Sequence, residues 1–479
     1  MARGWQPRPG DVVVRRPRLA QLRPTVFQLA LPKTPSRGLA SPLTVIYGFV
    51  LLVLVGTGGL LLPWANTQGQ VTPFMTALFT ATSAATVTGL VVVDTPSYWT
   101  PLGQAVIWAL ILIGGLGWMT IASFILLVIG QRLSLAHQLV MQQPLGLQQV
   151  GHVIRVMRQM VLTFLTMEAV GGLLLAWRFK ELLPGASWPS ALWQGLFHGV
   201  AAFNNAGFAI LPGSNNLSRL TLDLPALVVI MVLIILGGLS YPVMADLAVV
   251  RRWRRLTLDT KMVVMASLAL WVAGTLVVLG FEYGHSATLG PLPVWGKISN
   301  ALFLSVSART AGFNTVDFSG MTQATFFFII ALMFIGTASA STGGGIRVNT
   351  LGVVVATMVA SLRGQQYVNA FGREIPAQVV HRAIAVAFLG LSLVFVAAFL
   401  LTFMEPQGDF LSFLFEVVSA FGTVGLSTGV TPQLSIAGKV VIILTMLVGR
   451  LGPMSLALAL IARERPAVLR FAQEPVRIA

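Results

Sequence analysis

Four short glycine-centred segments, each set between apolar runs, limit the possible folds more than any other feature of the sequence. They read Ala85-Thr-Val-Thr-Gly-Leu90, Phe203-Asn-Asn-Ala-Gly-Phe208, Ala308-Arg-Thr-Ala-Gly-Phe313 and Ser419-Ala-Phe-Gly-Thr-Val-Gly-Leu-Ser427. Such segments are too short to span a membrane as helices. Non-helical backbone survives at membrane depth only where it is buried in protein or lines a water-filled cavity. Four copies therefore predict four walls around one axis, where a ring of backbone carbonyls can replace the hydration shell of a potassium ion.

The composition places this chain in a membrane. Its 479 residues are 56% hydrophobic and 10% charged, with a mean hydropathy of +0.82, whereas soluble domains carry about 25% charged residues. We therefore expect a polytopic membrane protein without a separate soluble domain. The lack of cysteine excludes disulfides, thiolate metal sites and cysteine nucleophiles, and the five histidines lack metal-ligand spacing.

The apolar runs repeat in the order long helix, half-helix, loop, long helix. A half-helix of about a dozen residues is too short to cross a core of ~30 Å and is typical of re-entrant segments. Outer helices are expected at 43–64, 154–177, 262–281 and 380–403, half-helices at 73–85, 190–203, 296–308 and 411–421, and inner helices at 101–129, 223–249, 323–359 and 436–462.

The predicted fold is an all-α polytopic membrane protein with eight transmembrane helices. Four helix–pore-helix–filter-loop–helix repeats would take a pseudo-fourfold arrangement around one pore per subunit. The repeats are expected at 41–130, 150–250, 260–360 and 378–463, between a basic cytoplasmic tail at 1–40 and a cytoplasmic C-terminus at 464–479.

A patch of small residues in each inner helix supports this assignment of the four repeats. The patches are Ile113-Gly-Gly-Leu-Gly117, Leu236-Gly-Gly-Leu-Ser240, Ile335-Gly-Thr-Ala-Ser339 and Val448-Gly-Arg-Leu-Gly452. Their first glycines follow the loop glycines by 25, 30, 24 and 24 residues. A single patch would indicate close helix packing, which favours small residues in membranes, but four in register with four loops favour a repeat.

The basic residues predict the orientation of the chain. If the loops face outward, 23 of the 31 Lys and Arg residues lie on the inner side, as expected for cytoplasmic segments. Both termini are then cytoplasmic. The charge of +16 thus indicates membrane topology rather than a nucleic-acid surface, and it also suits anionic lipid or an acidic partner ring.

The loop glycines Gly89, Gly207, Gly312 and Gly425 are predicted to form the centre of an ion filter, because glycine allows consecutive carbonyls to turn inward. The predicted coordinating oxygens belong to Val87, Thr88, Asn205, Ala206, Thr310, Ala311, Thr423 and Val424. No ring of Asp or Glu is present, which argues against a divalent-cation filter. The half-helices would also point their partially negative C-terminal ends toward the cation.

A run of small residues in the third inner helix predicts a break that could act as a gate. It comprises Gly336, Thr337, Ala338, Ser339, Ala340, Ser341, Thr342, Gly343, Gly344 and Gly345. This run should form a loop beneath the filter and obstruct the pathway, with Arg347 and Asn349 as possible tethers. The alternative is a tightly packed helical kink.

Three charged residues at membrane depth need separate interpretations. Arg450 occupies the patch position held elsewhere by Gly115, Gly238 and Thr337. A mid-membrane arginine costs roughly 2.5 to 3.5 kcal/mol and usually faces the bundle interior. There it would slow cations, unless it pairs with Glu416 or Glu168. Arg309 is expected to brace the third loop from behind rather than to enter the pore. Glu168 could bind a cation or pair with a neighbour, and pairing is favoured.

Together, the four loops, the Gly336–Gly345 run and the segment Val448-Gly-Arg-Leu-Gly-Pro453 resemble the Trk/Ktr/HKT superfamily of potassium transporters. The resemblance covers about residues 43–462 and is greatest to the KtrB-type membrane subunits of bacterial Ktr systems. It implies a homodimer with one pore per subunit in the cytoplasmic membrane of a prokaryote, with K⁺ as substrate and Na⁺ as a possible activator. It also implies a cytoplasmic, KtrA-like ring of RCK subunits that senses ATP and ADP. By position, the four loop glycines match the filter glycines, the Gly336–Gly345 run the gating loop and Arg450 the pathway arginine, while Gly89 favours potassium over sodium.

Two other classes of function stay open on the sequence alone. A secondary transporter of another cation or small solute would need broken helices and a polar midplane site, and the fourfold rather than twofold repeat argues against it. A membrane-embedded enzyme would need a cluster of His, Asp, Glu, Ser or Lys, and intramembrane acids and histidines are nearly absent.

Overall fold

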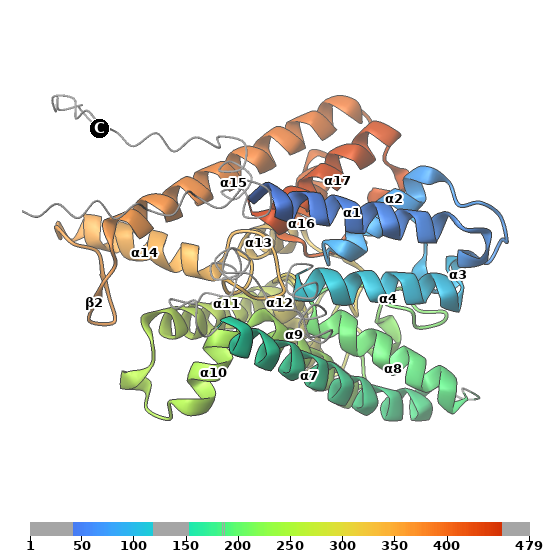
Figure 1. The fold of residues 1–479 in the computed structure, drawn as a ribbon, viewed down its shortest axis with the longest axis horizontal. Helices are drawn as coiled ribbons and strands as arrows, with labels where there is room; N and C mark the ends of the chain where they lie inside the picture. Colours follow the sequence, from blue (N-terminus) through green and yellow to red (C-terminus); the bar gives the residue numbers. More distant parts are fainter. Residues whose placement is uncertain (1–41, 118–152, 184, 186, 453–479) are drawn as a thin grey trace, which may run out of the picture. The chain divides into compact units, whose positions relative to one another are not determined.

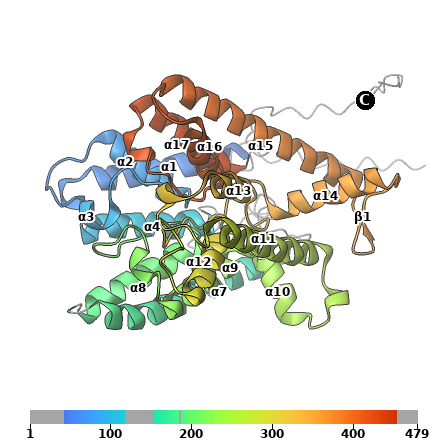
Figure 2. The same ribbon diagram turned by 180° about the vertical axis from the view of Figure 1, so that it is seen from behind.

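The computed structural model describes residues 42–117, 153–183, 185 and 187–452, which form helices and one two-stranded antiparallel sheet (Figure 1). The main helices are α1 (Pro42–Leu61), α2 (Phe74–Ala85), α3 (Thr95–Tyr98), α4 (Pro101–Leu116), α7 (Val153–Leu182), α8 (Trp188–Phe203), α9 (Leu224–Gly238), α10 (Tyr241–Val249), α11 (Leu258–Glu282), α12 (Val294–Ser307), α13 (Gln323–Phe334), α14 (Val348–Leu362), α15 (Ala377–Met404), α16 (Phe410–Gly422) and α17 (Ile436–Leu451). Short 3₁₀ turns are η2 (Pro63–Ala65), η4 (Ser218–Leu220), η5 (Trp253–Arg255), η6 (Phe318–Gly320) and η7 (Thr431–Gln433). The sheet is a hairpin of β1 (Asn369–Ala370) and β2 (Arg373–Glu374) between α14 and α15 (Figure 2).

Helix starts follow local capping signals. The Asp223 carboxylate accepts a hydrogen bond from the Ala226 amide at the start of α9, and the Ser435 hydroxyl accepts one from Gly438 at the start of α17. Each cap satisfies an amide that has no partner within the helix. Pro73 immediately precedes α2, where its missing N–H costs nothing.

Each expected repeat supplies a long helix, a half-helix and a third helix that pack together. The groups are α1 with α2 and α4, α7 with α8 and α9, α11 with α12 and α13, and α15 with α16 and α17. The third helix of each group also contacts the half-helix of the next, α4 with α8, α9 with α12, and α13 with α16. Since α17 contacts α2 in turn, the series of contacts closes on itself.

Patch glycines allow the third helix to approach its own half-helix. A Cβ atom added to Gly114 would overlap the carbonyl of Ala85, the last residue of α2, and one added to Gly449 would overlap that of Phe421 near the end of α16. Gly237 lies in the same way against Phe203, which ends α8. Close packing therefore explains the patches, and it fixes the end of each of these half-helices against the next segment of chain.

The inner helices are shorter than the sequence predicted. The range 223–249, expected to be one helix, divides into α9 and α10, which meet at an angle of 102°. Pro242 in the first turn of α10 cannot extend α9, because it lacks an amide hydrogen. In the first and fourth repeats, α4 ends at Leu116 and α17 at Leu451, each followed by a glycine with positive φ (Gly117, 80°; Gly452, 84°). The expected continuations to 129 and 462 lie outside the described residues.

Three described helices are long and apolar enough to cross a membrane: Ile154–Leu182, Leu258–Glu282 and Ala377–Met404. The bent pair α9 and α10 gives a fourth candidate span. Several other apolar helices have 10–17 residues, so the count of eight transmembrane helices stays a prediction.

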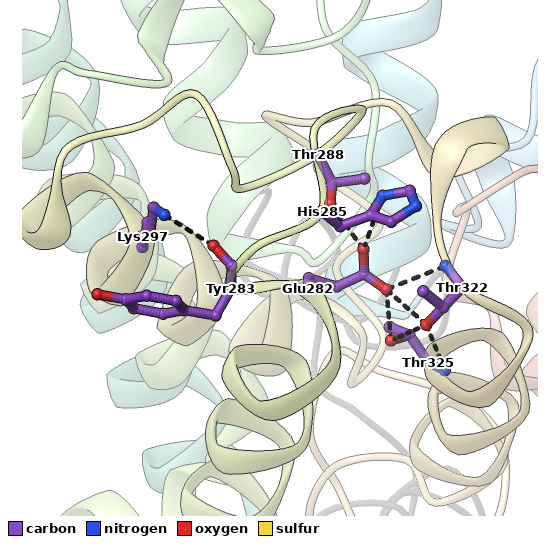
Figure 3. A network of polar contacts seen from close by, with 7 residues as sticks. All are labelled: Glu282, Tyr283, His285, Thr288, Lys297, Thr322 and Thr325. Carbon is purple, nitrogen blue, oxygen red and sulfur yellow. Dashed lines mark hydrogen bonds and ion pairs between the residues drawn. The ribbon is translucent and has the colours of Figure 1, made fainter.

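A buried carboxylate connects the end of one helix to the start of another. Glu282, the last residue of α11, accepts hydrogen bonds from the Thr322 amide at 3.0 Å and from the hydroxyls of Thr322 at 2.8 Å and Thr325 at 2.6 Å (Figure 3). Thr288 and His285 contact its other oxygen, at 2.6 and 3.6 Å. Because Thr322 caps α13, Glu282 fixes the third helix of this group relative to the long one.

Candidate functional site

The four glycine-centred loops meet in a closed ring. A Cβ atom added to Gly89 would clash with the Ala206 carbonyl, one on Gly312 with that of Val424, and one on Gly425 with that of Thr88. A Cβ on Gly207 would lie 3.0 Å from the Ala311 oxygen. Each glycine thus faces the carbonyl that precedes the glycine of another loop, so the structure brings together residues up to 337 positions apart in the sequence.

The loops share an unusual backbone conformation. Their glycines have φ values of 90°, 67°, 73° and 93° in chain order. The second residue before each glycine also lies in the left-handed region: Val87 (51°), Asn205 (56°), Thr310 (77°) and Thr423 (48°). Positive φ is rare for β-branched residues and costs about 1–3 kcal/mol where the surrounding structure imposes it. The same strain at matching positions of four loops indicates a shared requirement on the direction of the backbone.

The predicted coordinating oxygens accept no hydrogen bonds in the described part of the chain. This holds for all eight main-chain carbonyls, those of Val87, Thr88, Asn205, Ala206, Thr310, Ala311, Thr423 and Val424. All eight residues are fully buried, each with an exposed fraction of 0%. Buried carbonyls are normally paired, with protein or with water. Eight free carbonyls in the four loops that form the ring therefore indicate a binding site for a ligand that oxygen atoms coordinate, such as a cation.

Amides of the first and fourth loops donate hydrogen bonds to side chains outside the ring of carbonyl oxygens. The Ser83 hydroxyl accepts from the Gly89 amide and the Ser419 hydroxyl from the Gly425 amide, both at 3.0 Å. Glu416, buried in α16, accepts from the Thr428 amide at 2.8 Å and from the Ser427 hydroxyl at 2.7 Å. From the sequence, Glu416 is expected only as a possible partner of Arg450. The hydroxyl-rich stretch Ser427–Thr431 was the available signal for its actual role.

The predicted break in the third inner helix is confirmed: α13 ends at Phe334 and α14 begins at Val348. We call residues 336–347 between them the intramembrane loop. Its amides at Ala338 and Thr342 donate to the carbonyls of Gly238 and Gly237, at 3.1 and 3.3 Å. These are the last residues of α9, so the loop satisfies carbonyls that the break between α9 and α10 leaves without helical partners.

The intramembrane loop lies directly against three of the four filter loops. The Thr342 hydroxyl is in hydrogen-bond contact with the Asn205 amide group at 3.2 Å. Gly343 and Gly344 approach the side chains of Thr310 and Thr423 so closely that an added Cβ would meet each hydroxyl. Thr342, Gly343 and Gly344 of the predicted gate thus adjoin the predicted filter, and the gating role of the loop stays a prediction.

Arg450 binds this loop rather than a carboxylate. Its guanidinium group donates to the carbonyls of Thr342 and Gly343 in the loop and to those of Gly114 and Gly115 at the end of α4. The last carbonyls of a helix carry partial negative charge and attract a cation. The expected alternative, an ion pair with Glu416 or Glu168, is not found among the described residues.

Two further arginines donate to carbonyls of the intramembrane loop, Arg347 from within the loop and Arg309 from the third filter loop. Arg347 donates to the Gly343 carbonyl and, at 3.4 Å, to that of Ala338. Asn349 accepts from the Ser339 amide at 2.8 Å, so both expected tethers do contact the loop. Arg309 is fully buried, donates to the Gly336 carbonyl at 2.9 Å and lies over the Trp271 ring. It therefore links the third filter loop to the first residue of the intramembrane loop.

Glu168 has the neighbour that the sequence anticipated. Its carboxylate accepts from the Asn204 side-chain amide at 2.7 Å, and the same amide donates to the Val200 carbonyl at 2.9 Å. Asn204 precedes the filter residue Asn205, so this buried pair connects α7 to the second filter loop. Asn204 was not singled out from the sequence.

Comparisons of the sequence and of the structure with known proteins all find cation transport proteins. The family model for TrkH, described as a cation transport protein, matches residues 41–467. The Ktr system potassium uptake protein B of Bacillus subtilis is 40% identical over 414 residues, which cover 86% of this chain and 91% of the relative. The potassium/sodium uptake protein NtpJ of Enterococcus hirae is 35% identical over 92% of this chain and 97% of its own length. The crystal structure of the potassium transporter TrkH from Vibrio parahaemolyticus superposes with a TM-score of 0.64 at 18% identity, over 86% of this chain and 84% of the other.

Proposed function

Because this chain belongs to the TrkH family of cation transport proteins, and is therefore a multi-pass membrane transporter rather than an enzyme, we propose that it carries potassium into the cell. The pathway is a channel-like pore lined by the four filter loops, through which K⁺ moves down its electrochemical gradient. The four repeats are arranged around this pore with pseudo-fourfold symmetry. One pore lies in each subunit.

The observation that carries the proposal is that the four loops meeting in a ring hold eight buried carbonyl oxygens without hydrogen-bond partners in the described part of the chain. Carbonyl oxygens are the ligands that replace the hydration shell of K⁺ in selective filters. The C-terminal ends of α2, α8, α12 and α16 add partial negative charge next to the ring.

The intramembrane loop acts as the gate. It contacts three filter loops, and its carbonyls accept hydrogen bonds from the guanidinium groups of Arg347 and of Arg450 in α17. Two positive charges in a low-dielectric region repel a cation that leaves the filter. Conduction therefore requires the loop to move away from the filter.

The names of two relatives help to assign the transported cation and the partner of this chain. One is named for potassium uptake within a Ktr system and the other for potassium and sodium, so we assign K⁺ as the substrate and Na⁺ as an activator. The chain would work as a homodimer in the cytoplasmic membrane of a prokaryote, with both termini cytoplasmic. A cytoplasmic, KtrA-like ring of RCK subunits that binds ATP or ADP would control the gate.

Rubidium uptake into liposomes tests the proposed function. Purified full-length protein is reconstituted into potassium-loaded liposomes, and radioactive Rb⁺ uptake is measured against protein-free liposomes. We expect uptake that excess external K⁺ suppresses and excess Na⁺ suppresses much less. Absence of Rb⁺ uptake, or equal suppression by both cations, would contradict the proposal.

A further inference from the structure

Two side-chain hydroxyls at matching positions of the filter loops have no partner. Thr310 and Thr423 are each the second residue before a loop glycine, and both are 0% exposed. Neither Oγ1 has a hydrogen-bond partner in the described part of the chain. A buried hydroxyl without a partner costs about 1–3 kcal/mol. The first loop differs, because its hydroxyls, on Thr86 and Thr88, bond each other at 2.8 Å.

Polar side chains stand at the matching position of three of the four filter loops. The second residue before the glycine is Val87 in the first loop, Asn205 in the second, Thr310 in the third and Thr423 in the fourth. Three of these four side chains carry an oxygen that can bind a cation. Since all four residues share the same left-handed conformation, their side chains leave the loops in equivalent ways.

Three consecutive residues of the intramembrane loop lie against the three polar side chains, those of Asn205, Thr310 and Thr423. Thr342 contacts the Asn205 amide at 3.2 Å. A Cβ atom added to Gly343 would lie 2.5 Å from Thr310 Oγ1, and one added to Gly344 would clash with Thr423 Oγ1. Only residues without a side chain fit at the last two positions. The backbone of the loop therefore lies where a ligand of the two hydroxyls would have to lie.

We infer that Asn205, Thr310 and Thr423 form a second alkali-cation site, built from side chains, at the face of the filter that the intramembrane loop covers. This inference rests on the proposed function and adds a site to it. The carbonyl ring and this side-chain site then bind successive ions, and Thr342, Gly343 and Gly344 occupy the second site until the loop moves. Three neutral oxygens suit a partly hydrated monovalent cation and hold it weakly enough to be released.

Because of the charges near the second site, the loop and a cation cannot occupy this site at the same time. Arg450 donates to the carbonyls of Thr342 and Gly343, and Arg347 also donates to Gly343. While the loop covers the side-chain site, both guanidinium groups are therefore bound to the covering residues. Removal of the loop takes these hydrogen bonds with it and uncovers the two free hydroxyls.

Isosteric substitutions test the second site. Thr310→Val and Thr423→Val keep the shape of the side chain and remove the hydroxyl, whereas Thr310→Ser and Thr423→Ser keep the hydroxyl. The matched control is Thr402→Val in α15, where the lost hydroxyl bonds its own helix at the Ala398 carbonyl, at 2.9 Å. In the liposome assay, we expect each valine variant at the site to raise the Rb⁺ concentration for half-maximal uptake by about fivefold to tenfold, as befits the loss of one ligand of hydrogen-bond strength. Thr402→Val should match the unchanged protein, and each serine variant should take up Rb⁺ at a lower half-maximal concentration than the valine variant at the same position.

The possible results separate the site from the proposed function. If the unchanged protein and Thr402→Val transport Rb⁺ while both valine variants do so with an unchanged half-maximal concentration, the second site is wrong and the carbonyl filter stands. A higher uptake rate with an unchanged half-maximal concentration would assign the hydroxyls to holding the loop and also overturn the site. If the unchanged protein takes up no Rb⁺, the proposed function fails and the site with it. Thr310→Ala and Thr423→Ala give a second pair if a valine variant does not fold.

Discussion

Gly312 marks the closest approach between filter loops, and it shows why glycine is needed there. Its φ is 73°, and an added Cβ would overlap both the carbonyl oxygen and carbon of Val424. Both partners are backbone atoms, which cannot move aside as a flexible side chain would. Glycine is therefore required for conformation and for space at the same position.

Gly312→Ser should lower the preference for K⁺ over Na⁺. The new side chain displaces the Val424 carbonyl and widens or distorts the ring, so we expect the ratio of K⁺ to Na⁺ uptake to fall by about tenfold, which corresponds to ~1.4 kcal/mol. Competition by Na⁺ in the Rb⁺ uptake assay measures this ratio. The control is Gly58→Ser in α1, where nothing lies within 4 Å of an added Cβ. An unchanged ratio for Gly312→Ser would contradict the filter assignment.

The residues around the loops were harder to predict than the loops themselves. The four glycines stand in a recurring sequence context, so the residues that meet in the ring followed from spacing alone. Asn204 and Arg309 act through partners in other segments of the chain, Glu168 and the Gly336 carbonyl. No period or motif in a single sequence encodes those contacts, because only the packed chain brings the partners together.

At the scale of elements, the breaks in the inner helices and the intramembrane loop depend on each other. The carbonyls of Gly237 and Gly238 at the end of α9 accept hydrogen bonds from the loop amides, and those of Gly114 and Gly115 at the end of α4 accept from Arg450. The sequence indicated only the break in the third repeat. The Gly-Gly-Leu-Ser-Tyr-Pro run at 237–242 holds the signal for the second, since glycine and proline both disfavour helix continuation.

Arg450→Ala should increase basal uptake. It removes the hydrogen bonds that hold Thr342 and Gly343 against the filter, and a hydrogen bond to a charged group contributes about 1.5–3 kcal/mol. We expect the Rb⁺ uptake rate without any regulatory partner to rise by about tenfold, and a shortened 337–345 segment to give a similar leak. Arg382→Ala, an exposed arginine in α15, is the control for loss of charge. Unchanged rates in Arg450→Ala and in the shortened loop would exclude this gate.

Glu282→Gln should destabilise the fold without changing selectivity. The carboxylate accepts from the Thr322 amide and from three threonine hydroxyls (Figure 3), and a neutral amide cannot accept all of these hydrogen bonds. We expect a loss of at least about 2 kcal/mol of stability, measured as a lower Tm in detergent by tryptophan fluorescence. Glu374→Gln in the exposed hairpin strand β2 should leave Tm unchanged. Equal Tm values for both variants would show that the Glu282 network contributes little.

At the scale of the molecule, the closed series of helix contacts accounts for the position of the filter. The contacts α4 with α8, α9 with α12, α13 with α16 and α17 with α2 bring the ends of all four half-helices together. The helical class, the half-helices and the loops were predictable from hydrophobic runs and glycine. The closure was not predictable, because it depends on contacts between segments far apart in the sequence, such as α2 and α17, which are separated by more than 350 positions.

Anomalous X-ray scattering from crystals grown in rubidium chloride tests the central claim most directly, since it locates the ion itself. We predict a rubidium peak inside the ring, with the carbonyl oxygens of Thr88, Ala206, Ala311 and Val424 as its nearest protein ligands, and we predict its loss in Gly312→Ser crystals. A transport-competent protein whose rubidium peaks all lie outside the ring would contradict the account.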